Sequence, residues 1–470
     1  MKKLLGFLLL FAIVGAAGAW IWSGRQPPPA ITIVSPGAAM GATGVVDLTI
    51  ETPRGQLTLL DVVFEQSAKQ TTLFTLAQPG GATLTQAGPD TLHLTLPATR
   101  KQLPDLKSGE ARVIVHAART VLRGLRTLPA DVDKTFRVQL EPPQVSVVST
   151  HHYINLGGSE FVVLRVTPQD ATAGVRVGDK TYPSFPGSAV GIADPTMRVA
   201  MFALLYDQDL TTPIGVFASD AAGNLSTAPL DYKAFPKVFK RSRIDVPDAF
   251  LQRVVPQILG NSPDFAPEVA NPNDLVASFL AINGALRRKN AQQIAGYAKQ
   301  TAPQMLWVGP FQQLGNSQVE ASFADHRTYF YNGKEIDQQV HLGFDLAVTS
   351  SVEVVAGNNG KVVHAAFLGI YGNCVIIDHG LGVQSLYAHL SQIGVKVGDT
   401  VTKGKAIGRS GMTGLAGGDH LHFTMLVNGQ PVNPVEWWDT KWMQDRVLRK
   451  IREAGGQGAQ PAATAGAGVR

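Results

Sequence analysis

The chain has 470 residues, of which 44% are apolar and 16% charged, a balance typical of globular proteins and long enough for two to four domains. Its formal net charge is +5, and no RNA- or DNA-binding signature accompanies that charge. We therefore expect a cell-wall or membrane neighbourhood and no nucleic-acid partner. A single cysteine, Cys374, excludes an intrachain disulfide framework.

An apolar run near the N-terminus predicts a membrane-targeting segment. The run from Leu4 to Trp22 follows two lysines, approaches the ~20 residues that span a bilayer, and exceeds the ~7–15 of a signal-peptide core. We interpret residues 1–24 as a signal anchor with its positive end in the cytoplasm. A cleaved signal peptide is the alternative, because "AGA" at residues 17–19 suits cleavage. In both cases we expect an exported protein, inner-membrane anchored if uncleaved, with its bulk in the periplasm or cell envelope.

Short β-rich runs separated by turns follow the anchor. Segments such as "GVVDLTIET", "TLHLTLPA" and "EFVVLRVTP" alternate apolar and polar residues, which is typical of half-buried strands. Their spacing predicts two immunoglobulin-like β-sandwich modules, at residues 31–142 and 143–236. Neither module contains a chemical constellation, so we expect spacers, or arms that bind the wall or a wall-associated protein partner.

The apolar period changes from two to 3.6 after the basic junction "KVFKRSR". The segment "NPNDLVASFLAINGALRRKN" places its apolar residues on one helical face and offers Asn273 as the N-cap. We therefore predict a helical linker segment at residues 244–317. Residues 440–470 predict an amphipathic C-terminal helix and a low-complexity, disordered tail.

Three histidine-bearing segments lie between residues 318 and 439: "HLGFDLA" with His341 and Asp345, "YAHL" with His389, and "DHLHF" with His420 and His422. Each segment is weak when taken alone. On a strand, however, residues i and i+2 point to the same face, so the last two imidazoles are expected side by side, with the intervening leucine turned into the core.

Taken together, the three segments resemble the LytM/lysostaphin-type zinc metallopeptidases, the Gly-Gly endopeptidase or duplicated-hybrid-motif family, which cut peptide bonds in bacterial peptidoglycan. The order HxxxD, Y-x-H-L and HxH matches the family, and "YGNCVIIDHG" and "VKVGDTVTKGKAIGRSGMTG" are similar to its intervening strand and hairpin. The resemblance covers about a quarter of the chain. It implies an antiparallel-β LytM-type metallopeptidase domain at residues 318–439.

Carried over to this sequence, the resemblance implies that His341, Asp345 and His422 bind one Zn²⁺ ion and that His389 and His420 are catalytic without binding the metal. Three protein ligands leave a fourth position for water, whose pKa zinc lowers to about 7. Tyr387 remains open between a hydrogen bond to substrate and packing.

The expected fold class is therefore mainly β, with two sandwich modules, a helical linker and a C-terminal peptidase domain. The leading function is a zinc metallo-endopeptidase that hydrolyses stem or cross-link peptides of peptidoglycan in cell-wall remodelling. The bond is not fixed by the sequence: D,D cross-links and glycine bridges are both open. The alternative is a non-catalytic or latent LytM-type regulator of other wall hydrolases, with the helical segment over the groove. A lipoyl-like carrier, suggested by "GDTVTKGKAIG", leaves the histidines unexplained.

Overall fold

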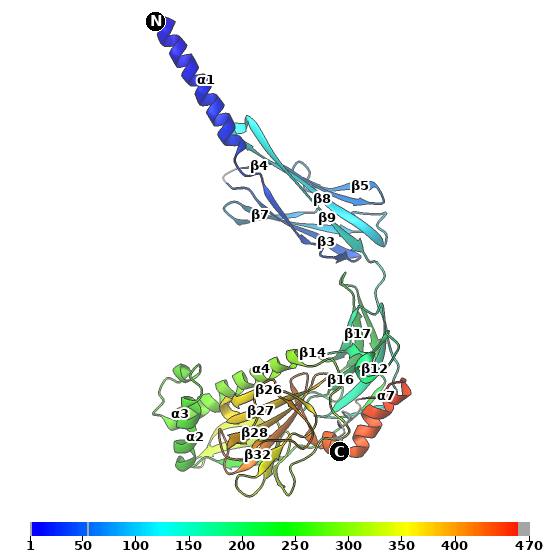
Figure 1. Ribbon diagram of the computed structural model, residues 1–470, viewed down its shortest axis with the longest axis vertical. Helices are drawn as coiled ribbons and strands as arrows, with labels where there is room; N and C mark the ends of the chain where they lie inside the picture. Colours follow the sequence, from blue (N-terminus) through cyan, green and yellow to red (C-terminus); the bar gives the residue numbers. More distant parts are fainter. Residues whose placement is uncertain (1, 54–55, 459–470) are drawn as a thin grey trace, which may run out of the picture. The chain divides into compact units, whose positions relative to one another are not determined.

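The computed structural model describes residues 2–53 and 56–458 and is mainly β, as predicted (Figure 1). The chain divides into two compact units, residues 1–143 with 219–226, and residues 144–218 with 227–470. The disordered tail predicted after the C-terminal helix falls largely on residues 459–470, which lie outside the described residues.

The first unit begins with helix α1 (Lys2–Gly24). Its segment Gly6–Gly24, with a mean hydropathy of 1.9, is long and apolar enough to cross a membrane, and a signal sequence satisfies the same criteria. Two sheets then pack around one apolar core. Their strands, in spatial order, are β1 (Ala30–Ser35), β3 (Thr43–Glu51), β7 (Thr91–Thr99) and β6 (Thr83–Gly88) in one sheet, and β2 (Ala39–Met40), β9 (Arg126–Val138), β8 (Gly109–Val121), β4 (Leu57–Gln66) and β5 (Lys69–Thr75) in the other.

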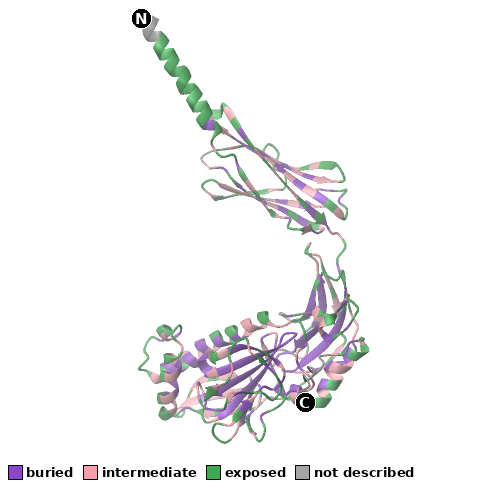
Figure 2. Ribbon diagram, viewed as in Figure 1, coloured by how far each residue is buried: buried purple, intermediate pink, exposed green. Residues whose placement is uncertain are grey.

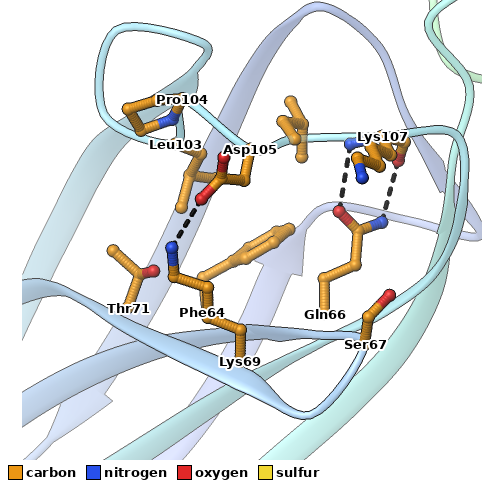
Figure 3. Close-up of a pocket in the computed structure, with 10 residues that line it drawn as sticks. Phe64, Gln66, Ser67, Lys69, Thr71, Leu103, Pro104, Asp105 and Lys107 are labelled. Carbon is orange, nitrogen blue, oxygen red and sulfur yellow. Dashed lines mark hydrogen bonds and ion pairs between the residues drawn. The ribbon is translucent and has the colours of Figure 1, made fainter.

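A hollow of about 290 Å³ lies between the β4–β5 hairpin and the segment that follows β7 (Figure 3). Phe64 forms its apolar floor, and Lys69 and Asp105 form an ion pair of 2.5 Å across one side. On the other side, the Gln66 amide donates to the carbonyl oxygen of Lys107 at 2.8 Å. The hollow does not identify an occupant, and the wall-associated protein partner stays a prediction.

The second module opens the second unit with two four-stranded sheets. The first contains β10 (Gln144–Val147), β12 (Ser159–Thr167), β16 (Met197–Ala203) and β15 (Phe185–Pro186) in spatial order. The second contains β14 (Lys180–Pro183), β13 (Thr172–Val177), β17 (Ile214–Ser219) and β18 (Leu225–Pro229). A short parallel pair, β11 (His152–Asn155) and β19 (Tyr232–Phe235), flanks them.

The segment after the basic junction begins with strand β20 (Arg241–Asp245) and continues as helices α2 (Asp248–Gly260), α3 (Leu275–Ala281) and α4 (Arg287–Tyr297), with a π-helical turn at Ile282–Leu286. The predicted apolar face is confirmed, since Phe279 and Ile282 are buried in one cluster. The predicted N-cap is wrong by one residue. Asp274 has the extended backbone of a cap, and its carboxylate accepts a hydrogen bond from the Ala277 amide at 3.0 Å.

The C-terminal sheet is antiparallel throughout its pairings. Its strands, in spatial order, are β21 (Gln318–Ala321), β24 (Phe344–Ala347), β32 (His420–Val427), β28 (Val383–Leu390), β27 (Asn373–Gly380), β26 (Gly360–Phe367) and β30 (Thr400–Val401), with β33 (Gln430–Val432) added to β32. A hairpin of β22 (Asp325–Tyr331) and β23 (Lys334–His341) pairs with β20, and a small sheet joins β25 (Glu353–Val355), β31 (Ala406–Arg409) and β29 (Gln392–Ile393).

One face of this sheet shares its core with the second module, which the sequence did not predict. Met425 of β32 and Phe202 of β16 belong to the same buried cluster. The chain then returns to the second module through α5 (Pro434–Trp438), α6 (Thr440–Trp442), a π-helical segment (Met443–Leu448) and α7 (Arg449–Glu453). Lys450 and Glu160 form a fully buried ion pair of 2.8 Å. The central strands of both regions are accordingly buried (Figure 2).

Candidate functional site

Neighbouring strands bring together the five residues predicted to form the site. His341 is the last residue of β23, Asp345 lies on β24, and His422 on β32 is paired in register with Asp345. On the other side of β32, Ala388 of β28 pairs with His422, so that the next residue, His389, lies at the same level. Leu421 points to the opposite face and is buried in the shared core, as predicted.

Three atoms that can serve as metal ligands converge at mutual separations of 2.9 Å. They are His341 Nε2, Asp345 Oδ1 and His422 Nδ1. All three residues are buried, and together they form a group that can hold a metal ion. The three predicted ligands are therefore adjacent, although they are separated by as many as 81 residues along the chain.

The hydrogen bonds behind the imidazoles leave lone pairs pointing at one another. The Thr424 hydroxyl donates its only hydrogen to the Leu342 carbonyl at 2.9 Å, so at 3.0 Å it must accept from His422 Nε2–H. Likewise, His341 Nδ1 faces the Ser322 carbonyl oxygen at 3.2 Å and must donate to it. With both protons placed on the outer nitrogens, the inner nitrogens and a carboxylate oxygen face one another as acceptors. This donor set fits a divalent cation.

A glycine in the first motif makes this close packing possible. A Cβ atom on Gly343 would lie 2.6 Å from both the His422 ring and the Thr424 hydroxyl. Because real Cβ contacts are longer, a larger residue would displace the imidazole that the threonine holds. The glycine within "HLGFD" therefore has a packing role directly beside the site.

Asp345 is held as a carboxylate. Burial favours its neutral form, but when the facing imidazoles carry protons on their inner nitrogens, the charge of His341 and hydrogen bonds from the surrounding histidines outweigh that effect and hold the pKa well below its usual value. When those nitrogens are unprotonated, a divalent cation supplies the positive charge instead. Its second oxygen, Oδ2, accepts a hydrogen bond from the Arg327 guanidinium at 2.8 Å. Oδ1 thus remains directed at the two imidazoles while Arg327 fixes the other oxygen.

The two remaining histidines lie beside the triad, and His420 Nε2 is 3.5 Å from Asp345 Oδ1. His389 Nδ1 donates to the Thr413 carbonyl at 2.8 Å, and His420 Nδ1 donates to the Gly418 carbonyl at 2.9 Å. Their Nε2 atoms then carry lone pairs, and the ring centroids lie 4.9 Å apart. His389 adopts a φ of +61°, a backbone region uncommon for a non-glycine residue and often found at functional sites.

Tyr387, whose role the sequence left open, has structural contacts. Tyr387 is 1% exposed, its hydroxyl accepts from the Gly357 amide at 2.7 Å, and its ring packs on Phe423. The structure therefore favours the packing role for Tyr387. His326 lies on the hairpin that carries His341 and, with Arg241 and Arg327, lines a hollow of about 310 Å³.

Sequence reasoning did not identify the residues that hydrogen-bond to the outer nitrogens of the histidines. Thr424 follows His422 by two positions on one strand, so alternation places both on the same face, and that signal was available. Thr413 contributes a backbone carbonyl, for which the sequence carries no side-chain signal.

The model of the Peptidase family M23 matches residues 339–434. Over 97 residues, 21% of this chain, the protein is 43% identical to "DD-carboxypeptidase/endopeptidase Mpg" of Neisseria meningitidis serogroup B, covering 22% of that relative. It is 29% identical over 187 residues to "Peptidoglycan DD-endopeptidase ShyA" of Vibrio cholerae, covering 39% of this chain and 40% of that one. The matched region thus spans about a fifth to two fifths of these relatives.

Among solved structures, a putative peptidase M23 from Pseudomonas aeruginosa is 19% identical, with a TM-score of 0.37, over 61% of this chain and 94% of the other. The catalytic domain of lysostaphin from Staphylococcus simulans is 28% identical, with a TM-score of 0.21, over 31% of this chain and 96% of the other.

Proposed function

We propose, from the M23 peptidase domain that residues 339–434 form, that this protein is a zinc metallo-endopeptidase that hydrolyses peptide bonds of bacterial peptidoglycan in cell-wall remodelling. The observation that carries the proposal is the convergence of three lone-pair atoms within 2.9 Å of one another, with two further imidazoles beside them. Because the relatives from Neisseria and Vibrio are named for DD-carboxypeptidase/endopeptidase and DD-endopeptidase activity, D,D cross-links are the proposed bond.

In this proposal His341, Asp345 and His422 hold one Zn²⁺ ion. Two imidazoles and one carboxylate are the three-ligand set of a catalytic zinc site, which keeps a position open. When bound, zinc supplies a water of lowered pKa and polarises the carbonyl of the scissile bond. Arg327 and Thr424 keep the ligand atoms oriented, through the hydrogen bonds that they make to Asp345 and His422.

His389 and His420 supply the acid–base chemistry. Each offers Nε2 at the site, since its Nδ1 proton is held by a backbone carbonyl. An imidazole in this state accepts a proton from the attacking water, and once protonated it donates to the developing oxyanion or to the leaving amine. The sequence has no HExxH motif and so no helix-borne glutamate base of that kind, and in this proposal the imidazoles carry the proton transfers.

The remaining modules fit an envelope protein. The strand order of the first module, β1-β3-β7-β6 facing β9-β8-β4, follows the A-B-E-D and G-F-C order of immunoglobulin domains, and the second module has the same order. This supports two immunoglobulin-like modules. The apolar helix α1 supports a membrane anchor, with the peptidase in the periplasm or cell envelope.

The test is digestion of purified peptidoglycan by the full-length protein in mild detergent, with mass analysis of the released muropeptides. We expect cleaved cross-link peptides, loss of cleavage on chelation, and its return with added zinc. Intact muropeptides from several wall types, with zinc demonstrably bound, would refute the proposal. The regulator alternative is not favoured, because all five residues are present and assembled.

A further inference from the structure

The segment Met412–Ala416 borders the site and holds His389. The Thr413 carbonyl is the acceptor that fixes the Nδ1 proton of this imidazole. The hydroxyl of the same threonine donates to the Leu390 carbonyl at 2.9 Å and accepts from the Asn373 amide at 2.9 Å. The position of one backbone carbonyl therefore decides which nitrogen of His389 is offered to the substrate.

Helix α2, which lies outside the matched family region, forms hydrogen bonds to this segment. The Arg253 guanidinium donates to the Met412 carbonyl at 3.1 Å and to the Ala416 carbonyl at 2.5 Å. One helical turn further on, the Gln257 side-chain oxygen accepts from the Gly414 amide at 2.9 Å. These three hydrogen bonds bracket Thr413 on both sides.

The other side of the segment is blocked by backbone. Gly414 has a φ of +74°, and a Cβ atom there would lie 2.4 Å from the Gly372 amide nitrogen. The Leu415 amide also donates to the Ile370 carbonyl at 2.9 Å. The segment is thus packed against residues 370–372 on one side and tied to α2 on the other. On the α2 side, the hydrogen bonds to the segment come from two half-buried side chains.

We propose that Arg253 and Gln257 are positioning residues for the hydrolytic reaction, acting through Met412–Ala416 on the orientation and tautomer of His389. The inference rests on the proposed function, because it assigns a reaction step to His389. It makes the helical segment a working part of the site. A segment that merely covered the groove, as in the latent alternative, would slow the reaction.

The consequence for the imidazole follows from its hydrogen bond. When the Thr413 carbonyl moves away, the Nδ1 proton loses its acceptor, and the ring is free to rotate or to carry the proton on Nε2. A ring protonated on Nε2 is not a base towards the attacking water. A misplacement of about 1 Å can lower a rate by about a hundredfold without touching the reacting groups.

The experiment uses the full-length protein in detergent with a soluble cross-linked muropeptide as substrate. Gln257→Met removes the acceptor at nearly constant shape, Gln257→Glu retains it, and Gln252→Met is the matched control, since Gln252 is exposed on the same helix. We expect Gln257→Met to lower kcat about tenfold to a hundredfold with KM and zinc content near the parent values. Gln257→Glu and Gln252→Met should stay within about threefold of the parent. Arg253→Met should behave as Gln257→Met does.

Histidine-selective ¹⁵N spectra supply a readout that does not depend on turnover. The parent should show the Nδ1–H form of His389, assigned by its loss in His389→Gln, and Gln257→Met should weaken it. Unchanged kcat and unchanged spectra in both Gln257→Met and Arg253→Met would overturn the inference, as would a rise in kcat, which would identify a lid. If Arg253→Met does not fold, Gln257→Met decides. If the parent cleaves no peptidoglycan, the proposed function fails, and the ¹⁵N spectra alone decide the positioning.

Discussion

Replacing Thr424 by valine tests whether the hydrogen bond behind His422 sets the metal affinity. Valine keeps the shape but removes the oxygen that accepts from His422 Nε2–H at 3.0 Å. His422 is 5% exposed, so water does not readily replace the lost partner. An unsatisfied buried donor costs about 1–3 kcal/mol. Loss of an outer partner of a metal-bound histidine weakens metal affinity by about 10–100-fold, which is about 1.4–2.8 kcal/mol. The two estimates agree, and we expect zinc affinity to fall within that range.

The assay is competition for zinc against a fluorescent chelator of known affinity, at fixed pH, for the parent, Thr424→Val and Thr424→Ser. Serine retains the hydroxyl and should bind within about threefold of the parent. Thermal unfolding without metal provides the control for folding. If Thr424→Val binds zinc as tightly as the parent while remaining folded, the hydrogen bond does not orient a ligand, and the assignment of His422 as a ligand is refuted with it.

Three further predictions address the roles of the histidines and the stability of the second unit. His422→Ala should lose zinc binding and cleavage together, whereas His389→Ala should retain zinc and lower kcat about 10²–10⁴-fold; joint loss of zinc in both would contradict the division of roles. Lys450→Met should lower the free energy of unfolding by about 3–5 kcal/mol, because it leaves the Glu160 charge unpaired in the core. Adding Glu160→Gln should recover most of that loss, and urea titrations of both variants measure it. Burial raises the pKa of Glu436 from 4.5 to about 7, so its contribution to stability is present below pH 4.5 and is lost as pH rises through 7. The free energy of unfolding of the parent should therefore fall roughly 2–3 kcal/mol more than that of Glu436→Gln between pH 5 and 8, and parallel curves would show that this carboxyl does not titrate in that window.

The histidines and the aspartate of the site were easier to predict from the sequence than the residues that hydrogen-bond to them. The adjacency of Asp345 and His422 was implied by the resemblance of their motifs to a known family, and the alternation of β32 places His420 beside His422. The contact of Arg327 with Asp345, by contrast, depends on a tertiary pairing of strands that local patterns do not specify.

The joining of the second module to the peptidase domain was not predictable for a related reason. Lys450 lies 290 residues from Glu160 along the chain, and in the sequence each looks like an ordinary surface charge. The amphipathic pattern after residue 440 predicted a helix correctly, found as α6, the π-helical segment and α7, but carried no information on what its apolar face would meet. The misplaced N-cap at Asn273 shows a smaller limit, since two adjacent residues of similar capping strength cannot be separated by preference alone.

The arrangement of the donor atoms on separate strands has a consequence for the newly made chain. Asp345 and His422 meet only when β24 and β32 have paired across 77 residues, and His341 arrives from a third strand. An extended polypeptide therefore has no preformed cage for the ion, so capture of zinc must follow closure of these distant loops. Under the proposed function, hydrolytic activity therefore cannot precede the pairing of these strands.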